Sequence, residues 1–254
     1  MAPVSTLPRI GTAGWSVPVS CRHLFPDDGA VLEKYAAHFN AVEINTSFYR
    51  PHRRATYEKW ASQVPEGFAF SVKLPREITH VRRLQASGDL VSRFAGEVAG
   101  LGPKLGAILV QLPPSLAFQP HDAGQVFHQL RHVSSAPIVC EPRHPSWFSD
   151  TAGQFLMAHH VARVAADPAP VAAAAEPGGS GGIAYFRLHG SPRMYYSDYS
   201  AEDLEGYSQR LEKLLQAGRG AWCIFDNTAV FAAMPNAMSL MALCGGGARQ
   251  AGGP

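Results

Sequence analysis

The sequence predicts an α/β protein with a single (β/α)8 barrel of the TIM type, and three observations support this. Eight short runs with β-strand character alternate with segments of helical spacing, which is typical of parallel sheets. The chain has 254 residues, a length at which α/β barrels commonly form one domain. No G-x-G-x-x-G turn follows the first strand, where a doubly wound dinucleotide-binding sheet would carry one. We therefore expect one barrel domain over residues 1–254.

The elements expected along the chain follow from local patterns. In one helix, Leu204, Tyr207 and Leu211 recur with helical spacing after Ser200, a suitable N-cap residue. Residues 168–182 are rich in proline, alanine and glycine, so the sixth helix is expected to be short or missing. A structured core is expected over residues 10–243, followed by a frayed tail at residues 245–254. The eight expected strands are Ile10–Ser16, Ala41–Tyr49, Ala69–Pro75, Leu105–Pro113, Pro137–Arg143, Val161–Asp167, Ile183–Gly190 and Ala221–Thr228.

Composition limits the class of protein. Hydrophobic residues make up 46% of the chain and charged residues 17%, which is ordinary for a globular protein with a large core. The formal net charge of +2 means that attraction to nucleic acid must come from a local patch. The four cysteines form no C-x-x-C pair and are expected to be reduced. Without an apolar leader or an apolar run of membrane-spanning length, we expect a cytoplasmic protein with no membrane partner. The oligomeric state is left open.

Polar residues gather near the C-terminal ends of the expected strands. Side chains two positions apart on a strand share a face, and the C-terminal face of a TIM barrel carries the active site. The sequence therefore predicts a pocket built from these residues: Glu43, Asn45, Lys73, Gln111, Glu141, Arg143, Asp167, Arg187, His189 and Asn227.

The predicted pocket contains residues suited to proton transfer. Glu43 and Glu141 are candidates for a general acid and a general base, because unlike surroundings separate the pKa values of two carboxylates. His189 is a candidate for proton transfer near neutral pH, or a hydrogen-bonded structural group. Lys73 would form a Schiff base if desolvated, but with acids nearby we expect it to stay protonated and bind an anion. The structural alternative is a layer of ion pairs that plugs the barrel.

Basic residues follow the second and third expected strands and suggest an anionic ligand. Arginine forms bidentate pairs with phosphate or carboxylate, although solvated loop charges would look the same. Tyr195, Tyr196 and Tyr199 add aromatic surface that could stack on a base or form a lid. We call the following residues the basic rim: Arg50, His52, Arg53, Arg54, Arg76, His80, Arg82 and Arg83.

A divalent metal is the rival explanation for the acidic residues. Glu43, Glu141, Asp167 and His189 are all acceptable ligands, but the same pocket also carries cationic side chains. We therefore expect no cofactor, with a metal as the alternative.

Several motifs together resemble the YecE-like family, the domain of unknown function 72, over about residues 10–243. The resemblance implies a (β/α)8 barrel and no agreed substrate, and it adds Trp15, Tyr49 and His80 to the expected substrate-binding set. Cys21–Pro26 departs from the aromatic pattern of the family, and Asp226 replaces a common asparagine, which adds a negative charge near the site. The motifs are Gly11-x-x-Gly14-Trp15, Val42-Glu43-Ile44-Asn45, Phe48-Tyr49, Phe70-Ser71-Val72-Lys73, Thr79-His80, Val110-Gln111-Leu112-Pro113-Pro114, Glu141-x-Arg143-His144-x-x-Trp147, Arg187-Leu188-His189-Gly190 and Asn236-Ala237.

The leading functional hypothesis is an acid/base enzyme, of hydrolase, lyase or isomerase type, for a small anionic substrate resembling a phosphorylated sugar or a nucleotide. One alternative is a nucleic-acid or phosphodiester binding protein, with or without metal-dependent cleavage. The other is a non-catalytic protein that binds a small ligand.

Overall fold

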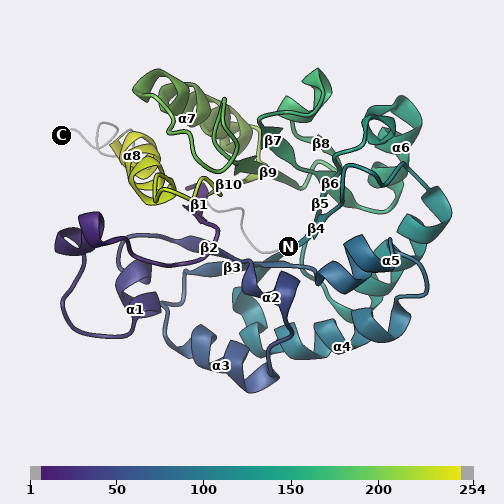
Figure 1. Ribbon diagram of the computed structural model, residues 1–254, viewed down its shortest axis with the longest axis horizontal. Helices are drawn as coiled ribbons and strands as arrows, with labels where there is room; N and C mark the ends of the chain where they lie inside the picture. The colour runs from purple at the N-terminus through teal and green to yellow at the C-terminus, as the bar shows by residue number, and fades with distance from the viewer. Residues whose placement is uncertain (1–6, 247–254) are drawn as a thin grey trace.

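The computed structural model describes residues 7–246. Strands occupy the centre of the molecule, and helices surround them (Figure 1). The eight expected strands are all present, although most end earlier than predicted, because the chain turns into loops at the polar residues. The strands are β1 (Arg9–Thr12), β2 (Ala41–Ile44), β3 (Ala69–Lys73), β4 (Leu105–Gln111), β5 (Ile138–Glu141), β6 (Val161–Arg163) with β7 (Ala165–Asp167), β9 (Ile183–Leu188) and β10 (Gly220–Phe225).

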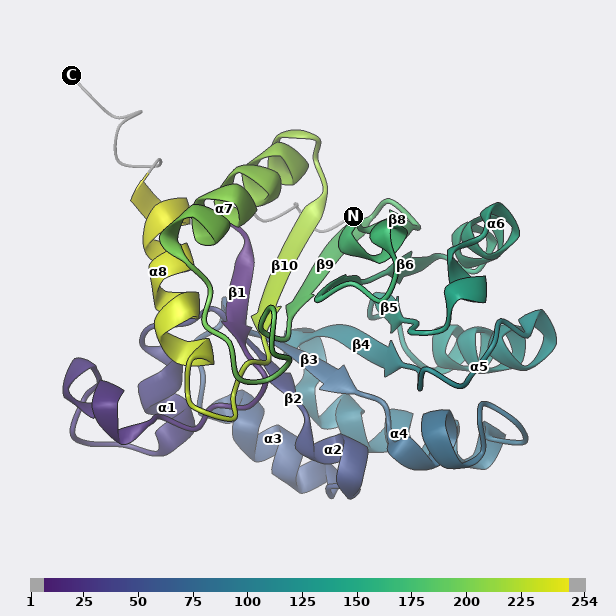
Figure 2. The same cartoon turned by 45° about the horizontal axis from the view of Figure 1, so that its top comes forward.

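The strands follow the parallel order of a TIM barrel but divide between two sheets. One sheet has the order β1-β10-β9-β7, and its strands β1, β10 and β9 lie side by side in Figure 2. The other has the order β2-β3-β4-β5-β6-β8, in which the short β8 (Gly178–Gly179) is antiparallel to β6. The arrangement is therefore TIM-like without one continuous hydrogen-bonded ladder around the barrel.

Two connections join the sheets. Between β1 and β2 there is a single parallel bridge of Ala13 to Glu43, and the Gly14 N–H donates to the Glu43 carbonyl oxygen at 2.9 Å. On the other side, residues 161–167 pair with β5 through β6 and with β9 through β7. One segment thus belongs to both sheets.

The helices agree with the sequence-based expectations. Ser200 caps α7 (Ala201–Gln216) and forms a capping box with Asp203. Between β7 and β9 the helix is replaced by a short 3-10 turn, η5 (Ala172–Ala175), which confirms the irregular sixth unit. Of the expected frayed tail, residues 245–246 end α8, and the remainder lies outside the described residues. The helices are α1 (Val31–Ala36), α2 (Thr46–Tyr49), α3 (Arg54–Ser62), α4 (Gly88–Val98), α5 (Pro120–Val133), α6 (Asp150–Ala158), α7 (Ala201–Gln216) and α8 (Ala233–Gly246), and the remaining short turns are η1 (Val19–Leu24), η2 (Glu77–Val81), η3 (Ala99–Lys104) and η4 (Pro145–Phe148).

Two separate apolar cores follow from the alternation of side chains along the strands. The larger core lies between the strands and the helices. The smaller one fills the barrel interior, where the rings of Tyr185 and Trp222 stack with centroids 5.6 Å apart. Alanines at positions 41, 69, 107 and 162 leave room for these rings. Side chains with the same parity further along each strand therefore enter the C-terminal face of the barrel.

The four cysteines are free thiols, as expected. Within residues 7–246, no helix is both long enough and apolar enough to cross a membrane.

Gly11 permits the close approach of β1 to β2. A Cβ atom at this position would overlap the carbonyl oxygen of Ala41 and lie 2.9 Å from the hydroxyl oxygen of Tyr35. That hydroxyl accepts a 2.8 Å hydrogen bond from the Thr12 N–H and donates to the Ala41 carbonyl oxygen at 3.1 Å. Tyr35 thus supplies hydrogen bonds where the ladder between the two strands is interrupted.

Gly11→Ala is expected to lower the free energy of unfolding by about 1–3 kcal/mol, because the new methyl group must push the Ala41 backbone away. Urea denaturation measures the change. Gly206→Ala is the matched control: this glycine lies in α7 with open space around its Cβ position, so the substitution should stabilise by roughly 0.5–1 kcal/mol. Equal effects of the two substitutions would contradict the assignment of Gly11 to a close strand contact.

Candidate functional site

Arg187 lies at the centre of the C-terminal face and binds three carboxylates. Its side chain is fully buried and forms a bidentate pair with Glu43, with Nη2 to Oε1 at 2.7 Å and Nε to Oε2 at 3.0 Å. Nη1 donates to Glu141 Oε2 at 2.6 Å, and Nη2 donates to Asp226 Oδ2 at 2.9 Å. We call Glu43, Glu141 and Asp226 the carboxylate trio. They come from β2, β5 and the end of β10, so one guanidinium group connects both sheets.

His189, two residues after Arg187, bridges two members of the carboxylate trio. Nε2 lies 3.0 Å from Glu141 Oε1, and Nδ1 lies 3.1 Å from Asp226 Oδ2. Burial acts to lower the pKa of His189, but Glu141 outweighs it and the net shift is upward. Since both ring nitrogens face acceptors, the imidazolium form satisfies both contacts. The two carboxylates therefore favour the protonated form of His189, which can donate a proton.

Glu141 is held in its ionised form. Burial alone would raise the pKa of this carboxyl group, but Arg187, His189 and Arg143 hold it well below its usual value. Arg143 Nη2 donates to Glu141 Oε1 at 3.0 Å, and its side chain is 16% exposed. Glu141 is thus a base only after one of its cations has moved or lost a proton.

A cavity of about 230 Å3 opens onto this part of the site. Glu141, Arg143 and His189 supply its polar wall. The remaining wall comes from apolar groups at Pro114, Ala166, Pro168, Ala169, Pro170 and Met194. The buried charges are therefore not sealed below the barrel surface on this side, and a small molecule in the cavity could contact a guanidinium and an imidazole together.

Lys73, at the end of β3, is the cation of the site without a close acid. Its side chain is 7% exposed, and Nζ lies 4.3 Å from the centroid of the Phe48 ring. Among the described residues, its Nζ has no hydrogen bond or ion pair. Burial and then Arg187 lower the pKa of Lys73 to about 8, although the carboxylate trio acts in the opposite direction.

His80 lies near Lys73, and its pKa is shifted in the opposite direction to that of His189. Its ring packs edge-on against Phe48 with centroids 5.0 Å apart, and Nδ1 lies 2.8 Å from the Thr79 hydroxyl oxygen. Burial, followed by Lys73 and then nearby arginines, lowers the pKa of His80 to about 4. The site therefore shifts the pKa values of its two histidines in opposite directions.

Several predicted site residues lie away from this cluster. Asp167 accepts a 2.7 Å hydrogen bond from the Tyr199 hydroxyl, and Asn227 donates to Ser197 and Asn236 in the layer between strands and helices. Asn45 begins α2, and its Oδ1 is buried and accepts no hydrogen bond from the described residues.

Two aromatic candidates also lie outside the cluster, whereas Gln111 lies next to it. Trp15 packs against Trp60 with ring centroids 5.0 Å apart, and Tyr49 is 72% exposed. Gln111 is buried beside Glu141 in the β4–β5 register.

Two residues of the cluster were not among the predicted pocket residues. Asp226 joins both Arg187 and His189, and the buried hydroxyl of Tyr185 donates to Glu43 Oε2 at 2.9 Å. Strand parity could have identified both, because Asp226 shares the interior face with Ile224, and Tyr185 shares it with Arg187. The same rule would have assigned Asn227 to the opposite face.

Three of the four proposed metal ligands meet in the cluster, but Arg187 lies between them. Glu43, Glu141 and His189 are connected through Arg187, while Asp167 is bonded to Tyr199. In the described part of the chain, no group of three or more His, Cys, Asp or Glu residues is placed to hold a metal ion. The oxygen atoms that a metal would need already accept hydrogen bonds from cations.

The basic rim is dispersed rather than continuous. Arg54 pairs with Glu58 at 2.9 Å, Arg82 lies 3.5 Å from Glu77, and Arg83 donates to the Ser115 hydroxyl at 2.9 Å. Half of the rim arginines are thus already bonded within the protein.

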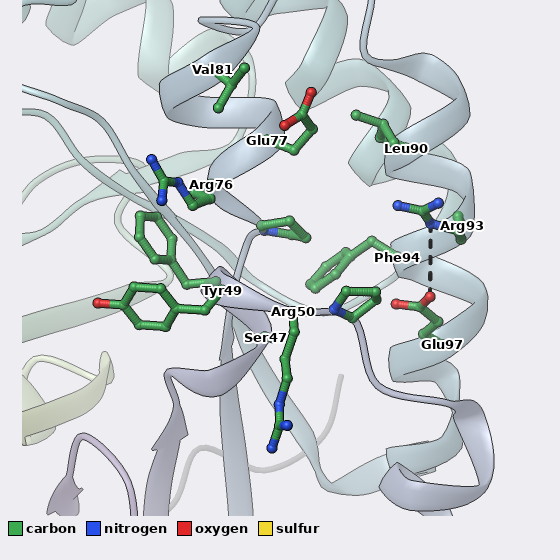
Figure 3. A pocket seen from close by; sticks show the side chains of 13 residues that line it. Ser47, Tyr49, Arg50, Arg76, Glu77, Val81, Leu90, Arg93, Phe94 and Glu97 are labelled. Carbon is green, nitrogen blue, oxygen red and sulfur yellow. Dashed lines mark ion pairs between the residues drawn. The ribbon is translucent and has the colours of Figure 1, made fainter.

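A second cavity, of about 310 Å3, lies between α2, η2 and α4 (Figure 3). Arg50 and Arg76 extend from it in different directions, and Arg93 pairs loosely with Glu97 at 3.9 Å. These arginines do not converge on one ligand position.

Comparisons with known proteins agree with the fold. The sequence profile of the family described as "Protein of unknown function DUF72" matches residues 9–253. The UPF0759 protein YecE of Escherichia coli (strain K12) is 33% identical over 171 residues, which cover 65% of this chain and 61% of YecE. The match thus spans about three fifths of that relative's length.

Solved structures give the same result. A DUF72 family protein from Enterococcus faecalis V583 superposes with a TM-score of 0.77 at 21% identity, covering 94% of this chain and 96% of that one. A fusion protein described as xylose isomerase-like TIM barrel/4-hydroxyphenylpyruvate dioxygenase superposes with a TM-score of 0.55 at 15% identity, covering 92% of this chain and 41% of that one. These likenesses support the TIM-like fold, and the profile match over nearly the whole chain shows that the protein belongs to the DUF72 family.

Proposed function

We propose that the C-terminal face of the barrel is the active site of an acid/base enzyme for a small anionic, sugar-like substrate. The observation that carries the proposal is the cavity at Glu141, Arg143 and His189. A guanidinium that is 16% exposed can bind a phosphate or carboxylate group there, and an imidazolium on the same wall can donate a proton to the bound molecule.

The members of the carboxylate trio differ in their roles. Glu141 lines the cavity and can receive a proton once His189 has given one up. Glu43 is fully buried and accepts from both Arg187 and Tyr185. Proton transfer by Glu43 stays a prediction, and its contacts favour a positioning role in which it orients Arg187.

A purely structural ion-pair layer is less well supported. Buried ion pairs add little net stability, because desolvation offsets the attraction between the charges. Such a layer would also need no opening. The cavity beside the charged cluster and the amine of Lys73, which has no close acid, are features that substrate binding explains.

The nucleic-acid alternative has weaker support, because half of the arginines in the basic rim are engaged within the protein. Arg193 also lies over the Tyr196 ring, 3.9 Å from its centroid, so this pair is stacked already. Salt-sensitive binding of a short oligonucleotide would favour this alternative over a small substrate.

Arg143→Ala is expected to abolish stabilisation of the protein by small phosphorylated ligands. Differential scanning fluorimetry with a panel of sugar phosphates measures the rise in Tm that binding produces. Arg54→Ala is the matched control, because Arg54 is an exposed arginine paired with Glu58 outside the cavity. A rise in Tm that survives Arg143→Ala but not Arg54→Ala would place the anion site elsewhere.

His189→Asn is expected to lower kcat by about 10²-fold or more on any sugar phosphate that the protein turns over, while leaving ligand binding largely intact. Since the pKa of His189 is raised, its protonated form persists to a higher pH than that of a free histidine, and activity that depends on it should fall as the pH rises through that pKa. Steady-state kinetics across pH measures both effects.

His121→Asn on the exposed surface of α5 is the control for this experiment, and it should retain full activity. Undiminished kcat in His189→Asn would remove His189 from the mechanism. Binding without turnover across the panel would instead favour the non-catalytic ligand-binding alternative.

A further inference from the structure

Lys73 differs from every other cation in the cluster. Arg187 and Arg143 each donate to a carboxylate at 3.0 Å or less, and His189 contacts two. Lys73 Nζ instead lies over the Phe48 ring, and within residues 7–246 it has no ion pair. The carboxylate trio is nearby, but its oxygen atoms are directed to the other cations.

At this position the ammonium group of Lys73 loses its proton more easily than that of an exposed lysine. A buried ammonium group without an acid has lost its hydration with no replacement, whereas an amine has less hydration to lose. The carboxylate oxygen atoms near Lys73 are also already engaged, because Arg187 contacts all three carboxylates, and Arg143 and His189 contact Glu141. Lys73 forms no ion pair with any of them.

The backbone fixes Lys73 at the C-terminal face of the barrel. It is the last residue of β3, and its carbonyl oxygen accepts a 2.7 Å hydrogen bond from the buried Ser47 hydroxyl. Its side chain shares the interior face with Ser71 and points towards the cluster. A lysine kept only to fill space here would be replaceable by an apolar side chain of the same length.

We propose that Lys73 is a nucleophile that forms an imine with the carbonyl carbon of the substrate. The inference rests on the proposed function and narrows its substrate class to small anionic aldehydes or ketones. Arg143 would bind the anionic group, and the carbonyl group would meet Nζ.

The lone pair of Nζ forms a bond to the carbonyl carbon, and one proton moves from Nζ to the carbonyl oxygen to give a carbinolamine. An acid of the site, for which His189 is the candidate, then donates a second proton to that oxygen. The C–O bond breaks, and the oxygen leaves as water with both protons. The product is a protonated imine, which withdraws electrons from the adjacent carbon.

The charges facing Lys73 from each neighbouring element support the inference. Lys73 interacts electrostatically with Arg187 on β9 and with the carboxylate trio, and it helps to lower the pKa of His80 on η2. The pKa of about 8 leaves a substantial fraction of neutral amine near neutral pH, which an exposed lysine lacks.

Reductive trapping tests the inference without requiring turnover. The folded protein is incubated with glyoxylate, a small anionic aldehyde, and sodium cyanoborohydride, which leaves a carboxymethyl group on the nitrogen that formed the imine. Peptide mass spectrometry then locates the modified lysines. At pH 7.5 we expect Lys73 to react at least about tenfold faster than the exposed Lys59 and Lys213, because more of it is neutral. Its rate should rise through about pH 8.

Two variants serve as controls. Lys73→Arg keeps the charge but cannot form an imine, and Lys73→Met keeps the length without the amine; both should lose the fast modification, and an unchanged Tm would show that they are folded. Modification of Lys59 and Lys213 without Lys73, or a Lys73 pH profile like theirs, would overturn the inference. If sugar phosphates still raise the Tm in that case, the proposed acid/base site survives while the imine does not.

Discussion

The hydrogen bonds of Arg187 to the carboxylate trio are the constraint on which the rest of the site depends. The guanidinium group is completely buried and donates hydrogen bonds to carboxylates from both sheets. Elsewhere the sheets meet through a single bridge near Gly14 and through the shared segment 161–167. Such a network contributes little net stability when complete, but loss of one member leaves a charge buried without a partner. It therefore specifies one arrangement of the strand ends.

Because Arg187 already contacts all three members of the carboxylate trio, His189 and Lys73 differ in how strongly they hold a proton. His189 contacts Glu141 and Asp226 at its two ring nitrogens, so its cationic form is favoured. Lys73 lies near the same carboxylates but donates no hydrogen bond to them, so burial has the largest effect on its pKa. One cluster thus contains a stabilised proton donor and an amine that gives up its proton easily. Both are useful for chemistry on a carbonyl compound.

Most of the fold could be predicted from sequence because it depends on local patterns. Hydrophobic runs gave all eight strand positions, and the proline- and glycine-rich stretch after Asp167 identified the missing sixth helix. Strand parity was a reliable guide to the site only where it was applied strictly. Position at a strand end alone predicts Asp167 and Asn227 as pocket residues, but their side chains lie on the helix side of their strands. The acid that enters the site is Asp226, on the interior face.

The sequence by itself determined that acids and cations would meet at one end of a TIM-like barrel, because residue order and the period-two alternation of strands decide which side chains share a face. Only the tertiary structure decided which acid pairs with which cation. Electrostatic and desolvation energies depend on distances of a few ångströms and on burial, which no spacing along the chain encodes. That is why spacing along the chain could not show that Lys73, predicted to lie among acids, forms no ion pair with them.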